Sequence, residues 1–86
     1  MMSTAQVLRR FVQDNFLFGQ EPTFSDGDSF LEQGIIDSTG VLELVTFLES
    51  EYGITVEDEE LVPENLDSIE NLVRFIDAKR SAAVQA

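Results

Sequence analysis

Very few side chains of this chain could act as catalysts or bind a soft metal ion. Its 86 residues include no His, no Cys and no Trp. The usual general base near neutral pH and the usual thiol nucleophile are therefore both absent, and soft-metal sites need the same two residue types. Carboxylates, hydroxyls, one Tyr and five Lys or Arg are left. We predict that the chain is not an enzyme and has neither a catalytic residue nor a metal site.

The most informative hydroxyl belongs to Ser38, in the stretch from Gly34 to Gly40. Asp37 is a good helix N-cap, which would place Ser38 in the first turn of a helix. An anion attached there would be stabilised by unpaired backbone N–H groups and by the helix dipole. Without a His to activate it, this hydroxyl suits a modification site better than an active site. An Asp-Ser pair before a helix is also ordinary capping, so these residues alone leave both interpretations open.

Three segments have the apolar spacing of amphipathic helices. The first runs from about Thr4 to Phe18, with Ser3 and Gln6 as a capping box and Gly19 as the C-cap. The second starts at Asp37 or Ser38, continues to about Tyr52 and ends at Gly53. The third begins near Asp67, which resembles a capping box together with Glu70. The apolar stripes are Val7, Leu8, Phe11, Val12 and Phe16 in the first helix, Leu44, Val45, Leu48 and Tyr52 in the second, and Ile69, Leu72, Val73 and Ile76 in the third.

Residues 20–37 break the helical pattern with Pro22, Gly27 and Gly34. So long a loop in a small domain is usually functional, and its apolar residues should pin it across the bundle as an ordered crossover: Phe24, Phe30, Leu31, Ile35 and Ile36. A short acidic segment, 56–62, should form one or two helical turns that stop at Pro63. We therefore predict an all-α bundle of three main helices and one short helix. It should form a single domain over residues 1–86, with a core of about 4–80 and a frayed tail, 81–86.

The stretch from Phe30 to Val45 resembles the attachment region of acyl and peptidyl carrier proteins. In that family a Gly precedes an Asp-Ser pair, and an amphipathic helix with Glu follows, as Gly34, Asp37, Ser38 and Glu43 do here. The likeness extends from Val7 to about Lys79 and includes the helix order and the long first loop.

This resemblance implies that a phosphopantetheinyl transferase attaches 4′-phosphopantetheine, taken from coenzyme A, to Ser38. The thiol of the arm would then hold an acyl or aminoacyl group as a thioester, loaded by an adenylate-forming ligase or an acyltransferase. Asp37 would be recognised by the transferase and cap the helix. Thr39 and Gly40 depart from many fatty-acid carriers and look closer to free-standing acyl or aminoacyl carriers, including D-alanyl carriers. Fatty acid, polyketide and nonribosomal peptide pathways all stay open.

One face of the second helix should turn away from the core, beside the attached arm. It comprises Thr39, Leu42, Glu43, Thr46 and Glu49. In the resembled family this helix docks on basic patches of downstream enzymes, so we predict a partner-binding face, with an ordinary solvated face as the alternative. Phe47 is not assigned to either side of the helix.

Charge and hydropathy restrict the location and partners of the chain. The net charge is −12, and all five Lys or Arg lie at or before residue 10 or at or after residue 74. Such a charge repels nucleic acid and anionic membranes and can steer the chain toward basic partners. No apolar run approaches the roughly 20 residues of a membrane span, and the N-terminal residues do not resemble a signal peptide. We expect a cytoplasmic monomer.

Two other functions are alternatives to the carrier interpretation: one stays open, and the other fails on the sequence. An acidic helical adaptor that binds a basic protein without a prosthetic group would have the same charge and bundle, but it gives no reason for an exposed Ser38. A calcium loop starting at Asp26 and Asp28 fails, because Leu31 replaces the required Gly and Asp37 replaces the usual final Glu.

Overall fold

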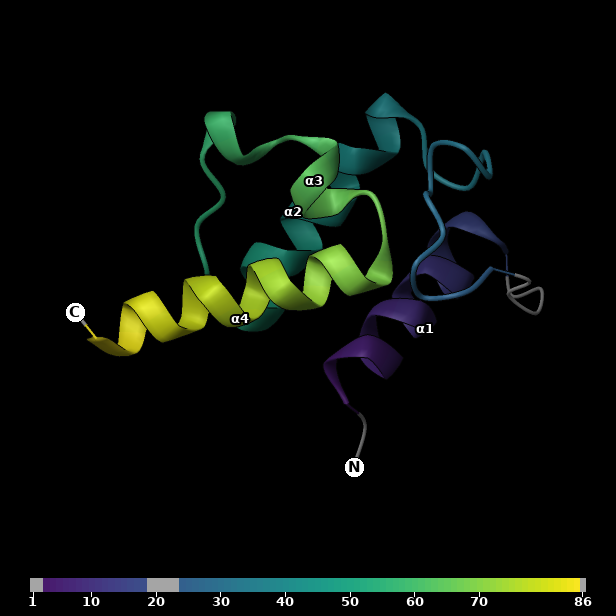
Figure 1. Cartoon of the computed structure of the whole chain (residues 1–86). Coiled ribbons are helices and arrows are strands. Elements are labelled where there is room, and N and C mark those ends of the chain that lie inside the picture. The colour runs from purple at the N-terminus through teal and green to yellow at the C-terminus, as the bar shows by residue number, and fades with distance from the viewer. Residues whose placement is uncertain (1–2, 19–23, 86) are drawn as a thin grey trace.

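The chain folds into four α-helices and one 3₁₀ turn in the computed structural model, which describes residues 3–18 and 24–85, with side chains up to residue 81 (Figure 1). The elements in order are α1 (Thr4–Phe16), α2 (Ser38–Tyr52), the 3₁₀ turn η1 (Asp58–Glu60), α3 (Pro63–Leu66) and α4 (Ile69–Gln85). Helix α4 packs against α1 and α3. The described residues contain no strand, which confirms the predicted all-α bundle of three main helices.

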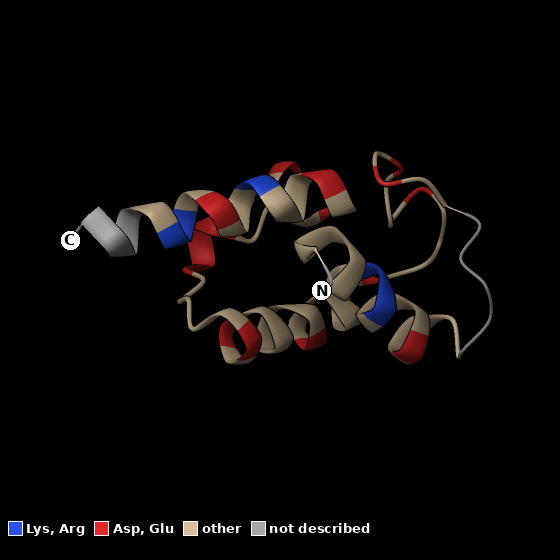
Figure 2. Ribbon diagram, turned by 90° about the horizontal axis from the view of Figure 1, so that it is seen from below, with Lys and Arg blue, Asp and Glu red and all other residues tan. Residues whose placement is uncertain are grey.

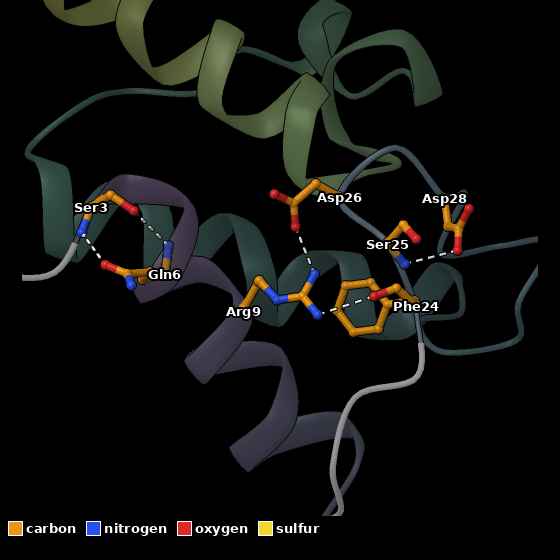
Figure 3. Close-up of polar contacts among 7 residues, drawn as sticks. All are labelled: Ser3, Gln6, Arg9, Phe24, Ser25, Asp26 and Asp28. Carbon is orange, nitrogen blue, oxygen red and sulfur yellow. Dashed lines mark hydrogen bonds and ion pairs between the residues drawn. The ribbon is translucent and has the colours of Figure 1, made fainter.

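Helix α1 begins with the predicted capping box. The Ser3 hydroxyl accepts a hydrogen bond from the Gln6 backbone at 3.2 Å, and the Gln6 side chain accepts one from Ser3 at 2.8 Å (Figure 3). Leu8 and Val12 are fully buried on its inner face. The helix ends at Phe16, two residues earlier than predicted, because Leu17 and then Phe18 leave helical geometry. The predicted C-cap, Gly19, lies outside the described residues.

Helix α2 has the predicted bounds. Asp37 caps its N-terminus, and Gly53 ends it at φ 65°, a left-handed conformation that glycine adopts without steric penalty. Leu44 and Leu48 are fully buried, while Val45 and Tyr52 are half-buried. Val45 and Tyr52 pack against the same core as Leu44 and Leu48, which confirms the predicted stripe.

The described part of the crossover, residues 24–37, is ordered by buried aromatic side chains. Phe24 and Phe30 are 5 % and 2 % exposed, and their rings meet edge to face with centroids 5.8 Å apart. Ile36 is buried as well, and Ile35 is half-buried. Leu31 is 50 % exposed, so the prediction that it anchors the crossover was wrong. The turn that buries Phe30 directs its neighbour outward.

Arg9 ties the crossover to α1. Its guanidinium donates to Asp26 Oδ1 at 2.6 Å and to the Phe24 carbonyl at 3.0 Å (Figure 3). The same group lies 4.6 Å from the centroid of the Phe24 ring, a distance at which cation–π attraction operates. One side chain of α1 thus fixes both the backbone and the ring of the first described crossover residue.

The segment after α2 differs from the prediction at Pro63. Only Asp58–Glu60 forms a helical turn, and Pro63 begins α3 instead of stopping a helix. Proline suits the first helical position because its fixed φ fits the helix and its missing N–H would be unpaired there anyway. The Lys79 ammonium donates to Glu60 Oε1 at 2.8 Å and so joins η1 to α4.

This contact predicts an acid-dependent contribution to stability. The hydrogen bonds from Lys79 and from the Glu57 backbone hold the pKa of the Glu60 carboxyl below its ordinary value of 4.5. Because the folded-state pKa is lowered, the contribution is complete above the unfolded pKa and is lost as the pH falls through the folded-state pKa. Lys79→Met should lower the free energy of unfolding at pH 7 by up to about 1 kcal/mol, and the difference should shrink below pH 4.5 in urea titrations. Arg10→Met breaks an exposed ion pair and should change the free energy of unfolding less. If the effect of Lys79→Met did not depend on pH, the ionised Glu60 carboxylate would not be the source of the stabilisation.

Helix α4 starts on a different cap from the one predicted. The buried Ser68 accepts a hydrogen bond from the Asn71 backbone at 3.1 Å, whereas the Asp67 carboxylate bonds the crossover. The Asp67–Glu70 capping box was therefore wrong. Ile69, Leu72 and Ile76 are fully buried as predicted, and the helical backbone continues to Gln85, beyond the expected core boundary near residue 80.

Candidate functional site

Ser38 is the first residue of α2, and its side chain is exposed. The preceding Asp37 has extended backbone geometry, and its Oδ1 accepts a hydrogen bond from the Gly40 N–H at 2.7 Å. The Asp37 carbonyl accepts from the Val41 N–H at 3.1 Å. Asp37 is thus the predicted cap, and its carboxylate is engaged by the backbone rather than by the Ser38 hydroxyl.

This arrangement suits a hydroxyl that receives a group. The backbone N–H groups of Ser38 and Thr39 precede the first intrahelical bonds of α2, and an anion beside them benefits from the positive end of the helix dipole. No His exists in the chain to take the proton of the hydroxyl. The geometry fits a phosphate ester at this position and gives Ser38 no means of acting as a nucleophilic catalyst by itself.

Gly40 allows the first turn of α2 to sit closely on its neighbours. A Cβ at this position would lie 2.8 Å from Phe16 Cε1 and 3.1 Å from Ile36 Cγ2. The buried glycine therefore brings the Ser38 end of α2 against the end of α1 and the end of the crossover. The sequence pattern around Gly40 resembles that of a known family, but it does not indicate this packing role.

A cavity of about 290 Å³ adjoins Ser38. Its walls come from the crossover, α2, the segment after η1, and α3. They are apolar apart from Ser38 and Asp67, and the lining residues are Phe30, Leu31, Ile36, Ser38, Val41, Leu42, Leu61, Val62, Pro63, Leu66 and Asp67. Three of these leucines are partly exposed, at 50 % for Leu31, 60 % for Leu42 and 36 % for Leu61. This cavity could not be predicted from the sequence, because its walls come from four separate segments.

The predicted partner-binding face divides into two groups. Thr39, Leu42, Glu43 and Thr46 are exposed beside Ser38 or one to two turns beyond it. Glu49 is half-buried, and its Oε2 accepts a hydrogen bond from the Val56 N–H at 2.9 Å. Glu49 therefore holds the segment that follows α2. The prediction that Glu49 belongs to the outward face of α2 was wrong.

Phe47 packs on the side of α2 that faces α1. Its ring stacks on that of Phe11 with centroids 4.0 Å apart, and the Tyr52 ring meets it edge to face at 6.5 Å. Arg80 of α4 lies 5.9 Å from the centroid of the Tyr52 ring. This aromatic cluster closes the end of α2 opposite Ser38.

The charge distribution separates α2 from the basic residues. Figure 2 shows the Lys and Arg positions on α1 and α4, whereas α2 carries only acidic charges. Asp26 is paired with Arg9, and Asp28 accepts from the Ser25 N–H at 2.9 Å. Within residues 3–18 and 24–85 no three carboxylates converge as a metal-ligand set. No helix in that part of the chain is both long and apolar enough to cross a membrane.

The fold and the site define a small helical domain that presents a hydroxyl at a helix start and has no catalytic group beside it. The family model for the phosphopantetheine attachment site matches residues 6–76. The chain therefore belongs to the phosphopantetheine-attachment family, whose domains are non-catalytic carriers with covalently bound 4′-phosphopantetheine. This confirms the resemblance to acyl and peptidyl carrier proteins and the prediction that the chain is not an enzyme.

One solved structure with the same fold is described as a crystal structure of an FAD-dependent dehydrogenase. It is 25 % identical to this chain, with a TM-score of 0.71 over 80 % of this chain and 97 % of that one. No curated protein matches the sequence significantly.

Proposed function

We propose that Ser38 is the attachment site of 4′-phosphopantetheine, and that the chain is a single carrier domain that presents acyl or aminoacyl thioesters to other enzymes. The observation that carries this proposal is the exposed Ser38 hydroxyl in the first turn of α2, beside the Asp37 cap and an apolar cavity. Asp37 holds the helix start in place and is available for recognition by the transferase.

The attached group would supply a thiol that holds the cargo as a thioester. This accounts for a carrier without Cys, because its reactive sulfur comes from coenzyme A. The chain itself supplies the Ser38 oxygen, and its helix start stabilises the phosphodiester there. Because cargo and docking surface are tethered, a bound partner meets its substrate at a raised effective concentration.

The partners fall into three groups. A phosphopantetheinyl transferase would modify Ser38, an adenylate-forming ligase or acyltransferase would load the arm, and downstream enzymes would dock through basic patches. The net charge of −12 and the acidic α2 support this electrostatic match. We propose that the domain works in the cytoplasm, where proteins rarely contain disulfides, and that it is a monomer, because a net charge of −12 makes copies of the chain repel one another.

Substitution of two acidic residues of α2 should change different properties of the protein: Glu43 should affect docking, and Glu49 should affect stability. Glu43→Ala removes an exposed charge, so we expect the KM of the transferase for the carrier to rise several-fold at low salt. The free energy of unfolding should change by less than about 0.5 kcal/mol. Glu49→Ala leaves the part-buried Val56 N–H without its acceptor and should lower the free energy of unfolding by about 1–3 kcal/mol. Urea unfolding and transfer kinetics at two salt concentrations measure both effects. Equal effects of the two variants on KM and stability would contradict this division of the face.

Intact-mass measurement tests the proposed function. The purified chain, first shown to be unmodified, is incubated with coenzyme A, magnesium and a broad-specificity phosphopantetheinyl transferase. We expect a gain of one phosphopantetheine, located at Ser38 by peptide mapping. A folded chain that gains no mass would refute the proposal and favour the acidic adaptor.

A further inference from the structure

Asp67 joins two walls of the Ser38 cavity. It is the C-cap of α3, and its own N–H donates to the Pro63 carbonyl at 3.0 Å. Its three oxygens all accept hydrogen bonds from the crossover. The backbone oxygen accepts from the Phe30 N–H at 2.8 Å, Oδ1 accepts from the Leu31 N–H at 3.0 Å, and Oδ2 accepts from the Ser29 hydroxyl. Residues 36 to 38 positions apart in sequence are thereby connected.

The crossover segment held by Asp67 is a compact turn. The Ser29 hydroxyl accepts from the Glu32 N–H at 3.1 Å, and the Phe30 carbonyl accepts from the Ile35 N–H at 2.9 Å. Gly34 completes the turn at φ 69°, in the left-handed region. Because of its internal hydrogen bonds, the turn of residues 29–35 should shift as a unit about the buried Phe30 ring when the contacts with the Asp67 carboxylate are lost.

This turn controls the surroundings of Ser38. It leads directly into Ile36, Asp37 and the start of α2, and Phe30 and Leu31 line the same cavity as Ser38. The exposed Leu31 comes from the crossover, and the exposed Leu42 comes from α2. Because Leu31 and Ser38 line the same cavity, an enzyme that binds over this cavity would contact the turn, and a change in the position of the turn would alter that contact without changing the hydroxyl.

We infer that Asp67 is a positioning residue for the modification of Ser38, because its carboxylate holds the 29–35 turn in the place where a partner enzyme meets it. This inference rests on the proposed function. Without the carboxylate, the turn should occupy several positions, and only a fraction of the molecules would present the binding-competent surface. Apparent affinity falls by that fraction, whereas the rate of transfer in the bound complex should stay the same.

Steady-state transfer of phosphopantetheine from coenzyme A to the full chain tests this role. For Asp67→Ala we expect the KM for the carrier to rise about tenfold and kcat to stay within about twofold, since hydrogen bonds to charged groups contribute enough for such a shift. Asp67→Asn should recover part of the effect, because its amide oxygen can still accept from the Leu31 N–H. Glu64→Ala removes the same charge from an exposed position in α3 and should behave like the wild type.

Hydrogen exchange of the unmodified protein gives an independent readout. The Phe30 and Leu31 amides should exchange faster in Asp67→Ala than in Glu64→Ala, whether or not any transferase accepts the chain. Faster exchange with unchanged KM would overturn the positioning role, and so would a loss confined to kcat. If Asp67→Ala does not fold, Asp67→Asn and Ser29→Ala should show smaller increases of KM, and wild-type kinetics in both would refute the inference. Failure of the wild type to be modified would refute the proposed function itself.

Discussion

Replacement of Ser38 with alanine is expected to abolish modification by the transferase completely while the domain stays folded. The side chain is exposed and the cap of α2 is supplied by Asp37, so alanine should fit the first turn without loss of packing. Exposed substitutions of this kind usually change the free energy of unfolding by less than about 0.5 kcal/mol. Intact mass and urea unfolding of the same preparation measure both expectations.

Two hydroxyls on the same helix provide matched controls. Thr39 neighbours Ser38, and Ser50 lies exposed near the other end of α2. Thr39→Ala and Ser50→Ala should each gain one phosphopantetheine. If Ser38→Ala also gained it, the attachment site would lie elsewhere, and if Ser38→Ala unfolded, the residue would be a structural part of the helix start.

Replacement of Phe30 with alanine should have the largest effect on stability. The ring is 2 % exposed and packs against Phe24, and truncation of a buried Phe usually lowers the free energy of unfolding by about 3–5 kcal/mol. Small domains have total stabilities of only about 5–15 kcal/mol, so the variant should unfold at much lower urea concentration. Unfolding followed by circular dichroism gives the midpoint and the slope needed to compare the variants.

The adjacent Leu31 distinguishes an ordered crossover from a flexible tether. Because Leu31 is 50 % exposed, Leu31→Ala should change the stability far less than Phe30→Ala, although it removes an apolar side chain from the same turn. Similar small effects at both positions would mean that the crossover contributes little to the fold and that its buried aromatic residues are not part of the core.

Local signals correctly predicted three helix boundaries: the start of α1 and both ends of α2. The capping box at Ser3 and Gln6, the cap at Asp37 and the left-handed Gly53 each act within three or four residues, so their effect can be recognised in the sequence. Pro63 was misinterpreted because proline both interrupts a helix and suits its first position. Which of the two applies depends on the residues that follow it.

Contacts between distant segments could not be predicted in the same way. Asp67 looked like a helix cap, and its actual partners lie 36 to 38 residues away. Glu49 looked exposed by helical spacing, but the chain returns to place the Val56 N–H against it. The Ser38 cavity depends on four segments meeting. Ser38 and Asp37 were identifiable because the site begins with a local helix-capping pattern.

The position of Tyr52 gives the protein a built-in optical reporter. It is the only Tyr, there is no Trp, and its hydroxyl is buried without a hydrogen-bond partner in the described part of the chain. Along α2 it lies about 21 Å from Ser38, at 1.5 Å per residue. Near-ultraviolet absorbance and fluorescence therefore come mainly from one phenol packed between Phe47 and Arg80. These signals can follow unfolding in every variant proposed above, with the chromophore far from the modified serine.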